Sequence, residues 1–126
     1  MMKLLNLPYQ VVKLAAGDLS LPAAETIDIE TWIPSQGRYR ESHSISTTTD
    51  FQARRLNIKL GDKLGSSFVL DKSKLGSRYV HILNGTAFAI GRTIIALLEN
   101  FQTEDGSVKI PEVLQKYTGF SEIKPK

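Results

Sequence analysis

The chain has 126 residues, which is enough for one domain with a buried core and too few for two. It contains no cysteine, which excludes disulfides and thiolate chemistry, and no apolar run is long enough to cross a bilayer. The formal net charge of +3 permits contact with nucleic acid but does not require it. Without a signal-peptide pattern at the N-terminus, a cytoplasmic protein with no membrane contact is expected.

The first half of the chain predicts strands followed by one short helix. In chain order these are strands over 9–14, 26–33 and 38–46, and a helix over 51–57. A loop at 17–24 and the turn PSQG at 34–37 separate the strands, so the second and third are expected to form an antiparallel hairpin. Asp50 is the candidate N-cap of the helix.

The second half opens with a glycine- and lysine-rich excursion at 61–77 and then predicts a strand over 79–89 that leads into a helix at 91–100. Five apolar residues at helical spacing predict a single buried face on that helix: Ile90, Ile94, Leu97, Leu98 and Phe101. A turn at 105–106 precedes a last helix from Pro111 to Tyr117, which Gly119 closes. The tail SEIKPK is expected to be frayed.

The junction between the 79–89 strand and its helix carries the clearest functional signal. Gly85, Ala87 and Ala89 recur with period two, so one strand face has almost no side-chain bulk. Arg92 follows in the first helical turn, where backbone N–H groups already favour an anion. A flat group beside an anion indicates a nucleotide. The alternative is close packing of helix on strand, with Arg92 merely exposed.

Several other chemistries have no support in the sequence. His43 and His81 lack the neighbours and spacing of a zinc site, and there is no Walker P-loop, dinucleotide fingerprint or GxSxG elbow. Alternation places Asp28 and Glu30 on one face of the 26–33 strand. They are either an acid/base pair or, as two carboxylates on an edge strand usually are, a solvated face.

Four colinear blocks then make the chain recognisable: LPYQVVKLAAGDL, DIETWIPSQGRYRES, TTDFQARRLNIKL and VHILNGTAFAIGRTIIALLENFQTEDGSVKIPEVLQKYTG. Together they closely resemble the C-terminal half of the catalytic domain of seryl-tRNA synthetases, which are class II aminoacyl-tRNA synthetases. The resemblance implies an α+β fold, an antiparallel sheet with flanking helices. It also implies that residues 1–126 are one C-terminal part of that catalytic domain, with motif 3 at about 79–100.

The resemblance implies a ligase that uses ATP and Mg²⁺ to convert serine to seryl-adenylate and transfers the seryl group to tRNA(Ser). Arg92 matches the motif 3 arginine that holds ATP, and Glu41 matches the glutamate that binds ATP and its magnesium; both are expected to be catalytic. Ser44 matches the serine that completes the ATP and metal site. Asn84 and Thr86 match positions of the serine pocket. Glu41 and Ser44 lie three apart, so they reach one metal only if their strand bulges or ends there.

The departures from the family pattern concern the ATP–metal site. His43 replaces a small hydroxyl residue, Thr47 replaces asparagine, and Ile27 stands where tyrosine is common. The family's upstream motifs and its coiled-coil arm are not in this sequence. We therefore expect weak ATP binding, no appreciable tRNA charging, and either a homodimer or association with the missing half. The alternative is a non-catalytic binding or regulatory module derived from a synthetase.

Overall fold

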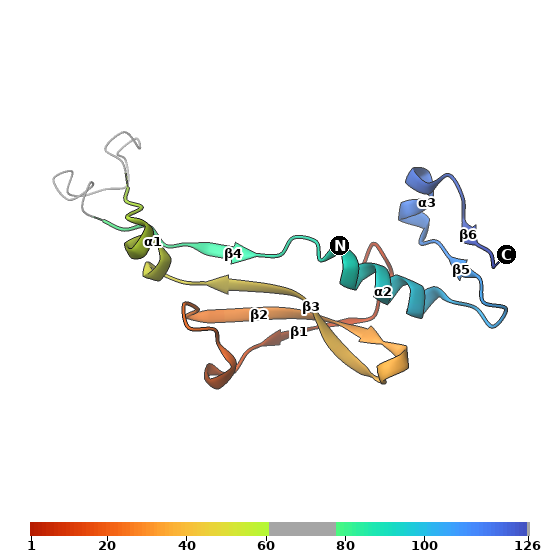
Figure 1. Cartoon of the computed structure of the whole chain (residues 1–126), viewed down its shortest axis with the longest axis horizontal. Helices are drawn as coiled ribbons and strands as arrows, with labels where there is room; N and C mark the ends of the chain where they lie inside the picture. Colours follow the sequence, from red (N-terminus) through yellow and green to blue (C-terminus); the bar gives the residue numbers. More distant parts are fainter. Residues whose placement is uncertain (61–77, 126) are drawn as a thin grey trace. The chain divides into compact units, whose positions relative to one another are not determined.

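The computed structural model describes residues 1–60 and 78–125 (Figure 1). One sheet has the strand order β1-β2-β3-β4, and a smaller sheet pairs β5 with β6. The strands are β1 (Tyr9–Lys13), β2 (Glu25–Ile33), β3 (Arg38–Thr47), β4 (Leu83–Gly85), β5 (Val108–Lys109) and β6 (Glu122–Ile123). The helices are η1 (Ala16–Asp18), η2 (Pro34–Gln36), α1 (Phe51–Leu56), α2 (Ile90–Phe101) and α3 (Glu112–Thr118). This is the predicted α+β fold. The excursion expected at 61–77 lies outside the described residues.

The turn between β2 and β3 forms where the sequence predicts it. Pro34 opens the short helix η2, and its fixed φ suits that position. Gly37 ends the turn with φ of +59°, a left-handed conformation that residues with a Cβ rarely adopt, and donates its N–H to the Pro34 carbonyl at 3.1 Å. The chain thereby returns as β3. On the far side of β3, Ser46 and Asn84 are opposite each other in an antiparallel register with β4.

The chain divides into two compact units. The first comprises Met1–Val12, Asp28–Ser44 and Thr86–Lys126. Its core gathers Met2, Leu5 and Leu7 from the N-terminal turns around Ile33 of β2 and Ala96 of α2, all nearly inaccessible to solvent. Partly buried apolar side chains complete it: Tyr9, Ile29, Leu97, Phe101, Val113 and Leu114. This core fixes α2 against the segment that carries the site.

The second unit comprises Lys13–Ile27 and Ile45–Gly85. Asp50 precedes α1 as predicted, but its side chain makes no cap hydrogen bond. The carboxylate instead pairs with Arg54 at 2.7 Å, one turn further on, and the hydrogen bond from Arg54 lowers the pKa of Asp50. The Arg54 guanidinium also lies 5.0 Å from the centre of the Tyr79 ring. Arg54 therefore ties the helix into the second unit.

Three sequence-based expectations about the second half are wrong. The strand expected over 79–89 is reduced to Leu83–Gly85, with one isolated bridge between Tyr79 and Lys59. The expected buried face of α2 is split, since Ile90, Ile94 and Leu98 are 43–67% exposed while Thr93 and Ala96 are buried. The tail is not frayed, because β6 pairs with β5 in the register Val108–Ile123.

Two smaller differences concern residues that the sequence assigned to element ends. Pro111 is the N-cap of α3 rather than its first residue, while Gly119 closes the helix as predicted, with φ of +76°. His81, which falls within the strand expected over 79–89, is exposed and lies outside β4. Neither difference alters the paths of α2 and β3, which carry the site.

Candidate functional site

The site begins at the N-terminus of α2. Ala89 occupies the N-cap and has no side-chain oxygen, so no cap hydrogen bond satisfies the first N–H groups of the helix. Arg92 is the third residue of the helix. An uncapped helix start and a guanidinium in its first turn together favour an anion at this point.

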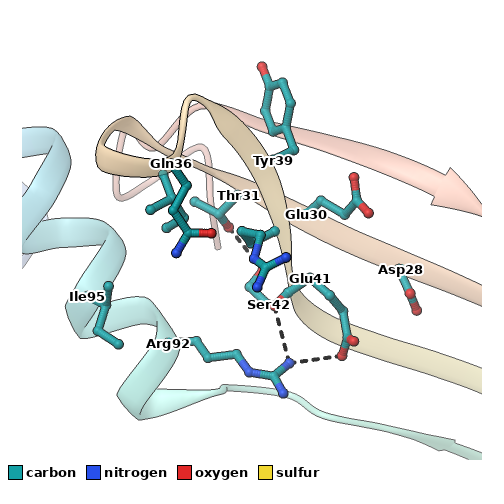
Figure 2. Close-up of a pocket in the computed structure, with 11 residues that line it drawn as sticks. Asp28, Glu30, Thr31, Gln36, Tyr39, Glu41, Ser42, Arg92 and Ile95 are labelled. Atoms are coloured by element: carbon teal, nitrogen blue, oxygen red, sulfur yellow. Dashed lines mark hydrogen bonds and ion pairs between the residues drawn. The ribbon is translucent and has the colours of Figure 1, made fainter.

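Arg92 reaches from α2 to Glu41 on β3. Its Nη1 donates to the Glu41 carboxylate oxygen Oε1 at 2.9 Å and to the Glu41 carbonyl at 3.2 Å (Figure 2). The two side chains remain 59% and 47% exposed, so solvent weakens the pair and its contribution to stability is small. An ion pair of this kind is readily exchanged for a ligand with stronger charges.

The pair lies in a cleft of about 570 Å³. Its lining comes from β2, the turn, β3 and α2: Asp28, Glu30, Thr31, Ile33, Gln36, Tyr39, Arg40, Glu41, Ser42, Arg92 and Ile95. A volume of this size is in the range of small-molecule sites. The predicted residues Glu41 and Arg92 are thus brought together in one cleft.

A buried hydrogen-bond network joins β2 and β3 at the cleft. Thr31 donates to the Ser42 hydroxyl at 3.0 Å, and Ser42 donates its single hydrogen to the Ile29 carbonyl at 2.9 Å. His43 Nδ1 lies 2.8 Å from the same hydroxyl oxygen, so Nδ1 must carry the hydrogen of this third bond. The remaining nitrogen, Nε2, is buried and has no partner among the described residues.

The environment of His43 favours a neutral ring, with its single hydrogen on Nδ1. Burial lowers the pKa of His43 below 6.5, and the nearby positive charges of Arg92 and the N-terminus lower it further. The ring also packs edge-on against Phe88, with centroids 6.3 Å apart. The imidazole that replaces the family's small residue is therefore buried and neutral, next to Ser42 of the cleft lining.

Asp28 is a site residue whose importance sequence reasoning missed. The solvated-face interpretation is wrong for it, because Asp28 is only 6% exposed, and its Oδ1 is buried without a partner in the described part of the chain. Glu30 is half-buried and accepts a hydrogen bond from Gln10. Figure 2 shows the two carboxylates pointing to opposite sides of β2, so they are not the acid/base pair either. In β2 the alternation of buried and exposed residues breaks after Asp28, so that Asp28 and Glu30 face different sides. The sequence TIDIE does not indicate this break.

The carboxylates of the cleft suit a metal cation that is held partly by the protein and partly by a bound ligand. Among residues 1–60 and 78–125, no three acidic or histidine side chains are close enough to hold a metal by themselves. Mg²⁺ is commonly held by one or two carboxylates together with substrate phosphates. Glu41 beside Arg92, with the unpartnered oxygen of Asp28 in the same cleft, fits this kind of site.

The other predicted residues lie outside the cleft lining. Ser44 is on β3, where regular alternation is interrupted because the consecutive residues Ser42 and His43 are both buried. Its carbonyl accepts the Thr86 backbone N–H at 3.1 Å. Thr86 is exposed. Asn84 is exposed on β4 and belongs to the second unit. The structure does not gather Ser44, Asn84 and Thr86 around Glu41 and Arg92 within one described pocket.

The fold and the cleft define a class of protein. Residues 1–101 match the family model of the tRNA synthetase class II core domain (G, H, P, S and T), and the chain belongs to that family. The predicted class II resemblance is thereby confirmed. No helix in the described residues is long and apolar enough to span a membrane.

Within the family, the relatives are serine–tRNA ligases. The chain is 54% identical to the enzyme of Pyrococcus abyssi and 52% identical to that of Dictyoglomus thermophilum, over 96% and 97% of its length. The seryl-tRNA synthetase from Pyrococcus horikoshii complexed with ATP superposes with a TM-score of 0.84, at 50% identity over 99% of this chain. The cytoplasmic serine–tRNA ligase from Naegleria fowleri in complex with AMP gives 0.82, at 39% identity over 98% of this chain. The chain spans about a quarter of the length of each relative: 25%, 26%, 26% and 28% in the same order.

Proposed function

We propose that this chain is the C-terminal part of a serine–tRNA ligase catalytic domain, with motif 3 at about 79–100, and that it holds the phosphates of ATP. In the whole enzyme, ATP activates serine to seryl-adenylate, and the seryl group passes to tRNA(Ser) in the cytoplasm. The observation that carries this proposal is the meeting of Arg92 and Glu41 in one cleft at an uncapped helix start.

The exposed ion pair supports a site in which Arg92 exchanges Glu41 for the phosphates of a nucleotide. A triphosphate carries more negative charge than one carboxylate and offers several oxygens to the planar guanidinium, so it competes with Glu41 for Arg92. Glu41 then becomes available to Mg²⁺, with Ser44 as a further ligand by resemblance. When bound, Mg²⁺ supplies neutralisation of the phosphate charge. Arg92 and Glu41 hold the nucleotide through its phosphates and so help to orient it for attack by serine.

The serine pocket is proposed on resemblance, with Asn84 and Thr86 in its lining. Both residues are exposed, so their polar groups are available to a small polar substrate. Because the chain spans only a quarter of its relatives, most of the contacts to ATP, serine and tRNA(Ser) lie elsewhere in the enzyme. We therefore expect weak ATP binding by this chain and no appreciable tRNA charging.

The proposed partner is a second copy or the remaining part of the enzyme. Ile90, Ile94 and Leu98 recur every four residues along the exposed side of α2. An apolar stripe of this kind is typical of a surface that another protein segment covers. This supports a homodimer, or association with the rest of the catalytic domain.

Calorimetric titration with ATP and Mg²⁺ tests the nucleotide site. Arg92→Ala removes the guanidinium that the phosphates need, and the affinity is expected to fall roughly tenfold or more. Arg38→Ala is the matched control, because Arg38 is an exposed arginine at the start of β3 outside the cleft lining. It removes the same charge and should change the affinity less than twofold. Equal affinities for wild type and Arg92→Ala would refute the proposed site.

A non-catalytic module remains the second candidate, because the buried His43 stands where the family has a small hydroxyl residue. A module that only binds other proteins would give no calorimetric signal with ATP, even in the wild type. At the other extreme, serine-dependent exchange between ATP and pyrophosphate at the rate of an intact synthetase would show that the chain is sufficient for activation. That result would contradict the weak binding proposed here.

A further inference from the structure

The inference concerns Asp28, the buried carboxylate in the cleft. The residue is 6% exposed, and Oδ1 has no hydrogen-bond partner among residues 1–60 and 78–125. A buried carboxylate oxygen without a donor costs folding free energy, and such atoms are rare in native proteins. An atom of this kind in the wall of a cleft indicates that a ligand supplies the missing partner.

The side chains around Asp28 already have other partners. Figure 2 shows the Asp28 carboxyl on the same side of the β2–β3 ribbon as the Glu41 carboxylate. Arg92, on that side, is bound to Glu41. The Ser42 hydroxyl donates to the Ile29 carbonyl and accepts from Thr31. Arg40 also lines the cleft, but no described side chain, Arg40 included, lies within hydrogen-bond distance of Oδ1.

We propose that Asp28 is a second carboxylate ligand, together with Glu41, for a divalent cation of the Mg²⁺ type, directly or through a metal-bound water. The inference rests on the proposed nucleotide site and adds a residue to it. Mg²⁺ prefers hard oxygen ligands and is held by one or two carboxylates plus phosphates. Asp28 and Glu41 supply two such carboxylates from neighbouring strands.

The charge balance of the cleft favours a divalent cation over an ammonium group. On the side of the β2–β3 ribbon where Asp28 lies, the lining has two carboxylates, on Asp28 and Glu41, and the guanidinium of Arg92 that is bound to Glu41. Once a triphosphate takes Arg92, Glu41 and Asp28 are left near additional negative charge. A single positive charge offsets only part of that repulsion, whereas a dication bridges carboxylate and phosphate oxygens.

Titration with Mn²⁺, followed by electron paramagnetic resonance in the absence of nucleotide, tests this assignment. Asp28→Asn keeps the shape and removes the charge, and it should weaken Mn²⁺ binding at least tenfold. Glu30→Gln is the matched control, because Glu30 lines the same cleft but is half-buried and bonded to Gln10. It should weaken Mn²⁺ binding less than twofold. Without metal, Asp28→Asn should melt no lower than the wild type, because an unpartnered buried charge has been removed.

Equal Mn²⁺ affinity for the wild type and Asp28→Asn would overturn the inference, as would a wild type that binds no Mn²⁺. Loss of serine affinity in Asp28→Asn with Mn²⁺ affinity unchanged would also overturn it, in favour of an ammonium site. If Asp28→Asn does not fold, Asp28→Ser provides the same comparison. Two measurements separate the two proposals: calorimetry with ATP and Mg²⁺ on the wild type and Arg92→Ala tests the nucleotide site alone, while Mn²⁺ affinity without nucleotide tests Asp28 alone.

Discussion

His43 has a titration behaviour that follows from its burial beside Ser42. In the unfolded chain its pKa is near 6.5, and in the folded chain burial lowers it, with Arg92 adding to the shift. Between the lowered value and 6.5, the unfolded state therefore binds more protons than the folded state. Stability gained from the neutral ring is present above pH 6.5 and is lost as the pH falls toward the folded pKa.

Urea unfolding across pH 7.5 to 5 tests this behaviour. The wild type should lose stability as the pH falls below about 6.5, where an unfolded histidine takes up a proton. In His43→Gln this part of the pH dependence should be absent, although the variant is less stable at pH 7.5 because the bond to Ser42 changes. Identical pH slopes for the two proteins would show that His43 is not held neutral by the fold.

The local residue pattern identified Arg92 and the family resemblance identified Glu41, but neither predicted which side chains surround them. The guanidinium in a first helical turn and the acidic residue on a strand are visible in the sequence, and the structure places them 2.9 Å apart. Asp28 was missed because an aspartate on an alternating strand normally indicates a solvent-facing side. Its burial depends on a break in alternation between Asp28 and Thr31, which is a tertiary effect.

At the scale of elements, the pairing of β4 with β3 explains why residue 85, in the segment that leads into α2, is a glycine. A Cβ on Gly85 would lie 3.1 Å from Cγ1 of Ile45, its partner across the β3–β4 pairing. Close packing of β4 on β3 thus accounts for Gly85, which differs from the packing of helix on strand that the sequence left open. Ala87 has no such partner and is exposed, so the rest of the segment remains available to a ligand.

Substitutions at two glycines separate this packing role from backbone propensity. Gly85→Val forces a branched side chain against Ile45 and should lower the free energy of unfolding by about 1 kcal/mol or more. Gly91 in α2 has no atom within 4 Å of an added Cβ, so Gly91→Ala should raise it by roughly 0.5–1 kcal/mol. Denaturant titration measures both. A Gly85→Val protein as stable as the wild type would show that the contact relaxes without cost.

Most elements of the first half were predictable, because turn residues and alternation determine the hairpin of β2 and β3 locally. The strands of the second half form by pairing with distant segments, and a local sequence pattern does not show which segments will pair. The tail forms β6 only because Val108 and Lys109 provide a partner strand. The core of the first unit covers only some of the apolar residues of α2 and leaves the others exposed. Helical periodicity therefore predicted the helix but not which of its residues are buried.

For the whole molecule, the exposed stripe of α2 and the share of its relatives that the chain spans have the same implication. Ile90, Ile94 and Leu98 are exposed in this chain, and the chain spans about a quarter of the length of its relatives. Both facts agree with the proposal that the cleft supplies part of a nucleotide site that the rest of the enzyme completes. The account therefore depends on whether Arg92 engages phosphate in this chain. Weak binding does not prevent that test, because nuclear magnetic resonance detects ligands at millimolar concentration.

The most direct measurement is the ¹⁵N-detected side-chain resonance of Arg92, assigned by its absence in Arg92→Lys. On titration with ATP the Arg92 guanidinium signal should shift, because the guanidinium exchanges the Glu41 carboxylate for phosphate. Titration with adenosine should leave it unchanged. If ATP binds while the Arg92 signal stays in place and other arginines shift instead, the phosphate site lies elsewhere and the account is contradicted.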